Sequence, residues 1–92
     1  MIKSWKHKGL EPFYLTGSKA GIQPAHARRL TILLQVLDAA ETAESLNLPG
    51  FYFHELDGQL KGHYSVRVNA NWRVLFQFQD KMAYVVNYLD YH

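Results

Sequence analysis

The sequence predicts an α+β domain in which a short N-terminal strand and two helices pack on one face of a small antiparallel sheet. Between residues 64 and 78 apolar side chains occupy alternate positions, which is the period of a half-buried strand. Between residues 27 and 40 they recur at intervals of three and four, the period of an amphipathic helix. Because the helical segments precede most of the strands, we expect helices gathered on one side of the sheet. The opposite face then stays open to a ligand.

The first third of the chain is expected to hold a short strand and a short helix. Residues 1–5 form the strand, and a basic cluster follows it, consisting of Lys6, His7 and Lys8. Such a cluster is usually a solvated surface, although a neighbouring anion site would give it a binding role. Residues 9–16 form the helix, which tolerates Pro12 in its first turn and which Gly17 ends.

A second, longer helix is predicted to begin near Pro24, because proline favours the first turn of a helix. Its apolar stripe indicates a side that belongs to the hydrophobic core. The stripe consists of Ala27, Leu30, Leu33, Leu34, Leu37 and Ala40. Beyond the helix we expect a turn at residues 46–50, a short strand at 51–53 and a loop at 57–62.

The last third of the chain is predicted to be an antiparallel meander. Residues 69–71, two asparagines on either side of an alanine, separate two alternating runs and favour a hairpin with a loop of about three residues. This loop keeps the two faces of the hairpin separate and places Arg67 directly opposite Arg73. A turn at residues 80–81 follows, and a strand over residues 82–91 returns beside the second run.

Alternation along these strands predicts a face that carries the two arginines, with Asn87 and Tyr91 beside them. The apolar side chains of Leu75 and Val85 share this face. Directly opposed like charges repel each other unless an anion lies between them. A guanidinium is a permanent cation whose planar fork matches phosphate oxygens, and tyrosine can stack on a base. The alternative is that both arginines extend into solvent without a ligand. The face therefore favours phosphate or nucleic acid as the ligand class.

Composition sets limits on the class of protein. With 92 residues, 48% of them hydrophobic, the chain is expected to form one domain over residues 1–92. The absence of cysteine excludes a disulfide framework and suits a reducing compartment. No apolar run is long enough to span a bilayer, and the first residues have no apolar stretch of signal-peptide type. We therefore expect a cytoplasmic protein without a membrane partner. A net charge of +2 permits nucleic acid binding without requiring it.

We expect neither a metal nor another cofactor. The five histidines lack metal-ligand spacing, and no cysteine accompanies them. Gly58 and Gly62 flank a predicted turn and do not open a helix, so they do not form a phosphate-binding loop.

Three stretches of the sequence resemble the HigB family of bacterial toxins, within the RelE/ParE superfamily. They are MIKSWKHKGL at the start, NANWRVLFQF in the middle and NYLDYH at the end. The resemblance runs along the whole chain and implies a RelE-like microbial RNase fold. It also implies a metal-independent endoribonuclease that cuts messenger RNA on the ribosome and contacts ribosomal RNA. A HigA-type helix-turn-helix antitoxin would neutralise it, and operator DNA would be reached only through that antitoxin.

The resemblance assigns candidate catalytic residues by position. His54 matches the family histidine, Arg73 the family arginine, and Tyr91 with His92 the terminal Asp-Tyr-His signature. Attack by a ribose 2′-hydroxyl on the adjacent phosphate needs a proton acceptor, a proton donor and a charge stabiliser. Arg73 fits the stabiliser, while the other three residues remain alternatives for proton transfer and for orienting the nucleotide. The candidates for RNA binding are Lys6, Lys8, Lys61 and Arg67. Structural or surface roles are expected for His7, His26 and His63.

Residues 54–60 depart from the family pattern. The family reads His-Pro-Leu-Lys-Gly-Asp-Arg here and this chain reads HELDGQL, so Asp57 occupies the lysine position and Leu60 the arginine position. A carboxylate beside a scissile phosphate is repelled by it. Either Lys61 or the basic cluster after the first strand supplies the missing charge, or Asp57 itself serves as a general base.

Three functions therefore stay open for the sequence. The first is a ribosome-dependent endoribonuclease toxin. The second is a weakened or inactive relative that binds its antitoxin and regulates the operon, which the departures at Asp57 and Leu60 favour. The third is a ParE-like inhibitor of DNA gyrase, against which the match at both ends of the chain argues.

Overall fold

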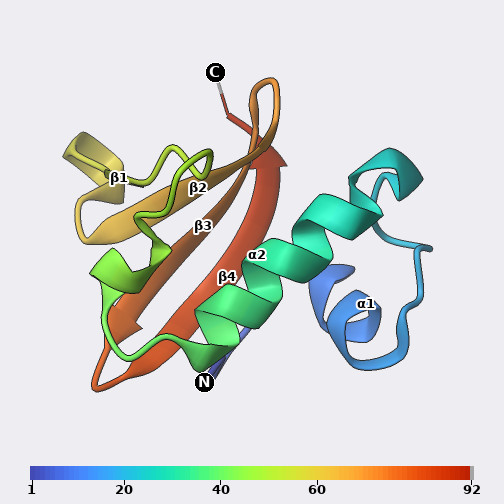
Figure 1. Cartoon of the computed structure of the whole chain (residues 1–92), viewed down its shortest axis with the longest axis horizontal. Coiled ribbons are helices and arrows are strands. Elements are labelled where there is room, and N and C mark those ends of the chain that lie inside the picture. The colour runs from blue at the N-terminus through green and yellow to red at the C-terminus, as the bar shows by residue number, and fades with distance from the viewer. Residues whose placement is uncertain (92) are drawn as a thin grey trace.

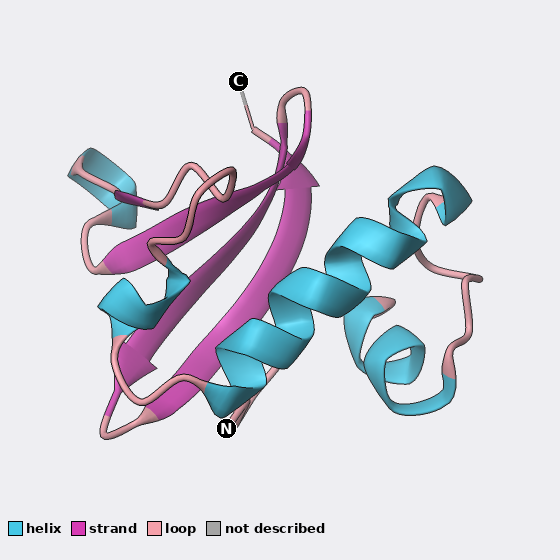
Figure 2. Cartoon of the chain, in the orientation of Figure 1, coloured by secondary structure: helices cyan, strands magenta, loops and turns pink. Residues whose placement is uncertain are grey.

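The computed structural model describes residues 1–91 and confirms the α+β architecture. Two helices, α1 (Leu10–Thr16) and α2 (Ala27–Ala39), lie on one side of an antiparallel sheet (Figure 1). The sheet has the order β1-β2-β3-β4. Its strands are β1 (His54–Glu55), β2 (His63–Asn69), β3 (Trp72–Gln79) and β4 (Met82–Asp90). Short 3-10 turns occupy Pro24–His26, Ala43–Leu46 and Gly58–Leu60 (Figure 2).

The residues that the sequence marks as helix ends bound both helices in the structure. The first ends at Gly17, whose φ of 82° suits a residue without a side chain and whose N–H donates to the carbonyl of Phe13 at 2.8 Å. Pro24 opens a 3-10 turn that leads into α2. The predicted apolar stripe is confirmed, because four of its leucines are buried: Leu30, Leu33, Leu34 and Leu37.

The core lies between α2 and the inner face of the sheet. The leucines of α2 meet alternating strand residues of which each is at most 1% exposed, namely Val66, Val74, Phe76 and Val86. Full burial of one such side chain stabilises the fold by about 1.5–3 kcal/mol. The predicted alternation thus assigns the inner face of β2 and β3 correctly, and the outer face is left for the site.

The expected N-terminal strand does not form as a strand. The first residues instead run parallel to β4 and make two isolated bridges, Ile2 with Ala83 and Trp5 with Val86. The carboxylate of Asp38 in α2 accepts hydrogen bonds from the Ile2 N–H at 2.8 Å and from the Tyr14 hydroxyl at 2.9 Å. One side chain therefore fastens the N-terminal segment and α1 to α2.

The predicted strand at residues 51–53 is also wrong, and the strand lies just after it, in β1. Tyr52 has a φ of 50°, which interrupts the extended conformation that a strand needs. Phe51 turns into the core and makes one ladder-like contact, in which its carbonyl accepts from the Arg67 N–H at 2.8 Å.

The hairpin between β2 and β3 has the predicted register but a shorter loop. Arg67 pairs with Arg73, as expected. Asn69 pairs with Trp72, so the loop has only Ala70 and Asn71 between the strands. A bulge between Arg67 and Asn69 inserts the extra residue that keeps the two faces separate.

A second bulge interrupts the pairing of β3 with β4. Leu75 pairs with Asn87 and Gln77 pairs with Tyr84, so three steps along β4 match two along β3. Val85 lies within this bulge and has a φ of 47°, a rare conformation for a β-branched residue. The hydroxyl oxygen of Ser4 accepts a hydrogen bond from the Val85 N–H at 2.8 Å and holds the bulge in place.

Candidate nucleic-acid interface

The outer face of the sheet presents its side chains in rows, because residues directly opposite each other project from the same face. The central row crosses the described strands as His54, Ser65, Leu75 and Asn87. The row toward the β2–β3 hairpin contains Arg67, Arg73 and Leu89. The row on the other side of the centre contains His63, Gln77 and Tyr84. Two of the predicted site residues, His54 and Arg73, therefore come from adjacent rows of one surface.

Tyr52 brings the two arginines together at the β1 side of the sheet. The Arg73 guanidinium donates through Nη1 to the Tyr52 carbonyl at 3.4 Å, and the Arg67 guanidinium carbon lies 5.0 Å from the centre of the Tyr52 ring. A cation over an aromatic face is stabilised by about 0.5–1 kcal/mol at an exposed site. Neither contact supplies a negative charge, so the mutual repulsion of the guanidinium groups favours an anion between them.

His54 lies at the edge of this surface. It is exposed on β1, opposite Ser65, and its row is about 7 Å along the strands from the arginine row. It also follows Tyr52, the residue that contacts both arginines, by only two residues in the chain. An exposed imidazole on the same face as two cations can exchange a proton with a phosphate ester bound near it.

Ser65 is a buried polar residue within the central row. It is 1% exposed, and its hydroxyl finds no hydrogen-bond partner among residues 1–91. A buried hydroxyl left without a partner costs about 1–3 kcal/mol. Ser65 is paired directly with His54 of the neighbouring strand. It belongs to the same alternating set of positions as Arg67, so the sequence pattern already included it.

Tyr91 extends the arginine face toward the end of the chain. Its N–H donates to the Asn71 carbonyl at 2.7 Å, and its side chain is 38% exposed. Since Arg73 pairs with Leu89, alternation puts Tyr91 on the diagonal from Arg73. His92, the other terminal candidate, lies outside the described residues.

The lysines expected to bind RNA do not gather at the arginines. Lys61 is exposed in the loop between β1 and β2. Lys6 runs beside β4, where its N–H donates to the Val86 carbonyl at 2.9 Å, and Lys8 follows it, also exposed. Lys6 and Lys8 thus lie beside β4, whereas Lys61 lies with Asp57 in the loop at the end of the sheet away from the arginines.

The residues that depart from the family pattern lie away from the arginine row. The Leu56 N–H donates to the His63 carbonyl at 2.9 Å, so Asp57 follows at the end of the sheet opposite the arginines. Asp57 is exposed, and the Leu60 carbonyl lies 3.2 Å from His63 Nδ1.

Two other histidines have structural roles, as expected. His26 is 4% exposed, and its Nδ1 lies 2.7 Å from the Tyr88 hydroxyl. His7 Nδ1 accepts a hydrogen bond from the Gly9 N–H at 3.0 Å, and burial lowers the pKa of this imidazole below its usual value. Among the residues that the structure describes, no group of three or more His, Asp or Glu side chains is placed to hold a metal.

Sequence reasoning missed Tyr52 as a site residue. Its neighbours Phe51 and Phe53 indicate a strand, and a strand would not turn the Tyr52 carbonyl toward Arg73. The left-handed backbone that makes both contacts carries no signal in a tyrosine, because glycine and asparagine are the residues that mark such a conformation.

Comparison with solved structures shows which proteins share this fold. The chain superposes on the structure titled "YoeB-YefM complex from Staphylococcus aureus" with a TM-score of 0.62 and 17% identity, over 100% of this chain and 98% of that chain. A YafQ mutant from E. coli gives a TM-score of 0.59 and 18% identity, over 96% of this chain and 91% of that chain. The fold is therefore that of the RelE-like toxins. No described helix is long and apolar enough to cross a membrane.

Comparison of sequences narrows this class to one family. A family model described as "RelE-like toxin of type II toxin-antitoxin system HigB" matches residues 3–92. "Endoribonuclease HigB" of Proteus vulgaris is 41% identical over 92 residues, covering 100% of both chains. "Toxin HigB-1" of Vibrio cholerae is 38% identical over 94 residues, covering 100% of this chain and 98% of the relative. The chain belongs to the HigB-like family of type II toxin–antitoxin toxins, which confirms the resemblance of the three sequence motifs.

Proposed function

We propose that this toxin is a metal-independent endoribonuclease that cuts messenger RNA on the ribosome. The observation that carries the proposal is the pair Arg67 and Arg73, both in contact with Tyr52, on the face of the sheet that also carries the exposed His54. The pair presents two permanent cations on an open surface, and an RNA phosphate supplies the anion that such a pair favours. The name "Endoribonuclease HigB" of the Proteus vulgaris relative supports the same activity.

The reaction follows from the chemical types present. The ribose 2′-oxygen forms a bond to phosphorus as a base removes its proton, and the bond between phosphorus and the 5′-oxygen breaks. The departing oxygen takes up a proton, which leaves a 2′,3′-cyclic phosphate and a 5′-hydroxyl. Arg73 stabilises the charge on the phosphoryl oxygens. His54 carries out one proton transfer, and Tyr91 or His92 carries out the other or orients the nucleotide.

The placement of Asp57 supports an active enzyme. More than four residues of strand separate its position from the arginine row, which corresponds to about 13 Å. Over that distance in water a unit charge repels a phosphate by only about 0.3 kcal/mol. Lys61 lies in the same loop and offsets part of this repulsion. The loss of the family lysine therefore leaves the charge stabilisation by Arg73 in place.

The proposed partners follow from the family and from this surface. A HigA-type antitoxin neutralises the toxin, and operator DNA is reached only through that antitoxin. The structure titled as a heterotetrameric YoeB-YefM toxin-antitoxin complex of Staphylococcus aureus gives a precedent within the fold for such a partner. Lys6 and Lys8 beside β4, and Lys61 in the loop between β1 and β2, are exposed cations that would contact messenger or ribosomal RNA. Action on translating ribosomes puts the protein in the cytoplasm.

The test is to induce wild type, Arg73→Ala and Asp57→Lys in bacteria that lack the antitoxin, and to map new messenger 5′ ends. We expect wild type to arrest growth and cut messenger RNA, and Arg73→Ala to do neither. If only Asp57→Lys cuts messenger RNA, the natural protein is a disarmed toxin whose role lies in antitoxin binding. Growth arrest without cleavage, accompanied by a loss of plasmid supercoiling, would instead support gyrase inhibition.

A further inference from the structure

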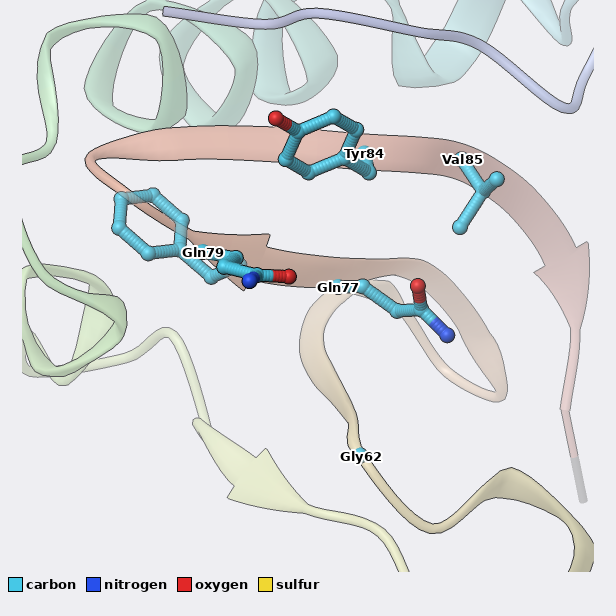
Figure 3. A pocket seen from close by; sticks show the side chains of 6 residues that line it. Gly62, Gln77, Gln79, Tyr84 and Val85 are labelled. Atoms are coloured by element: carbon cyan, nitrogen blue, oxygen red, sulfur yellow. The ribbon is translucent and has the colours of Figure 1, made fainter.

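A shallow pocket of about 390 Å³ lies on the outer face, at the end of the sheet away from the arginines. Its walls come from β3, from β4 and from the loop before β2 (Figure 3). The lining residues are Gly62, Gln77, Phe78, Gln79, Tyr84 and Val85. The polar groups that line the pocket are two amides and a phenol. All three are uncharged, so the pocket adds no positive charge to that of the arginine row.

The β4 bulge creates this pocket. The extra residue in β4 lets the neighbouring side chains of Tyr84 and Val85 both line the pocket, whereas a regular strand would turn one of them inward. Val85 has a left-handed φ of 47° within the bulge. Ser4 fixes the bulge, since its hydroxyl oxygen accepts from the Val85 N–H at 2.8 Å and its carbonyl from the Val86 N–H at 3.1 Å. Strained backbone that the surrounding structure maintains is concentrated at functional sites.

A chain of contacts orients the amide of Gln77. His63 Nδ1 lies 3.2 Å from the Leu60 carbonyl, which can only accept, so this nitrogen carries the proton. The other ring nitrogen, Nε2, then accepts from the Gln77 amide nitrogen at 3.4 Å. One N–H of the Gln77 amide thus donates to His63, and the carbonyl oxygen of the oriented amide is left to accept from a ligand.

We propose that this pocket binds a nucleobase of the same RNA strand whose phosphate lies on Arg67 and Arg73. Gln77 selects a base with an exocyclic amino group on its pairing edge. The inference rests on the proposed function. The row of Gln77 and Tyr84 lies two rows, or about 13 Å, from the arginine row on the same face of the sheet. Single-stranded RNA is read by hydrogen bonds to base edges and by stacking on aromatic rings, and the Gln77 oxygen and the Tyr84 ring supply both.

The test compares the base composition around messenger cuts made by wild type, Gln77→Leu and Ser4→Ala in antitoxin-free cells. Gln35→Leu is the matched control, because Gln35 is an exposed glutamine on α2, on the opposite side of the sheet. Wild type should favour an amino-bearing base over uracil roughly fivefold at one position near the cut, which is the effect of one hydrogen bond. Gln77→Leu should erase that preference and Ser4→Ala should weaken it without touching the base. Gln35→Leu should retain it.

The outcomes separate this inference from the proposed function. If wild type and Gln77→Leu cut with the same base composition, the pocket is not a base site and the endoribonuclease assignment stands. If wild type cuts nothing, the proposed function fails and the base site fails with it. If the Gln77→Leu cut sites are unchanged and neutralisation by the antitoxin is lost, the pocket belongs to the protein partner. Circular dichroism of each purified variant shows whether it is folded.

Discussion

Tyr52 contacts both arginines of the site through different parts of the same residue. Its ring lies beneath Arg67 and its backbone carbonyl accepts from Arg73. Each contact depends on the left-handed backbone of a residue that is 56% exposed. The side chain contributes little to the core, so its conformation is best explained by the arrangement of the cations.

Replacing Tyr52 with glycine separates these effects. Tyr52→Gly removes the ring, retains the carbonyl and relieves a backbone conformation that costs an L-residue about 1–2 kcal/mol. We expect messenger cleavage to fall roughly two- to fivefold, in line with the loss of one cation–π contact. The urea midpoint should barely change, because this lost contact and the larger backbone entropy that glycine loses on folding offset the relieved strain. Tyr52→Phe, which keeps the ring, should cleave as wild type does. Equal loss in both variants would mean that the tyrosine hydroxyl is the group that acts.

Ser65 gives a second prediction, on stability. Ser65→Ala removes a buried hydroxyl that has no partner within residues 1–91, so we expect the free energy of unfolding to rise by about 1 kcal/mol. Urea denaturation followed by circular dichroism measures this change. A decrease in stability would show that the hydroxyl is satisfied in solution.

At the scale of the elements, alternation predicts β2, β3 and most of β4, because one face of each strand is buried and apolar. It also predicts the pairing of Arg67 with Arg73. It fails where an element depends on tertiary contacts. The N-terminal segment stays a pair of bridges, and the extra residue at Val85 shifts the alternation of β4 without any sequence signal. For this reason, neither the pocket nor the contacts of Tyr52 with the two arginines could be predicted from the sequence.

The hydrogen bonds of Asp38, which join the N-terminal segment and α1 to α2, make the stability of the fold depend on pH. Burial, followed by the hydrogen bond to Asp38 and the charge of that carboxylate, raises the pKa of Tyr14 to about 12. Unfolded tyrosine ionises near pH 10, so between pH 10 and 12 the folded state binds a proton that the unfolded state has lost. The free energy of unfolding should therefore fall as the pH rises through this range.

Tyr14→Phe tests this dependence by urea denaturation at pH 9, 10 and 11. We expect the variant to be less stable at pH 9 and to lose less of its stability as the pH rises. The stability of the variant should still fall to some extent as the pH rises, because burial also raises the pKa of Tyr88. Parallel stability curves for wild type and Tyr14→Phe would show that the Asp38 contact is not maintained in solution.

For the whole molecule, the net charge of only +2 makes the placement of charge more important than its sum. Helices lie on one face of the sheet (Figure 1), and Arg67 and Arg73 belong to the other face, where we propose that the phosphate backbone of RNA binds. When a protein binds single-stranded RNA, the logarithm of the binding constant falls with the logarithm of the salt concentration, with a slope of about 0.7 for each phosphate contacted.

Arg67→Ala should lower the magnitude of this slope by about 0.7 for a 2′-O-methyl RNA, as measured by fluorescence anisotropy.

Arg28→Ala is the control for that experiment, because Arg28 is exposed on α2, on the other side of the sheet. Its salt slope should equal that of wild type. Equal slopes for all three proteins would place the RNA away from the arginine face.

The most direct test of the central claim is cleavage by purified protein on ribosomes programmed with a defined messenger RNA, comparing wild type, Arg73→Ala and Arg28→Ala. Removal of one oxyanion-stabilising group typically slows catalysis by about 10²–10³-fold, and we expect a loss of that size for Arg73→Ala with unchanged thermal unfolding. Arg28→Ala should cleave at the wild-type rate. Cleavage by Arg73→Ala at the wild-type rate would contradict the assignment of the arginine face as the site of RNA cleavage.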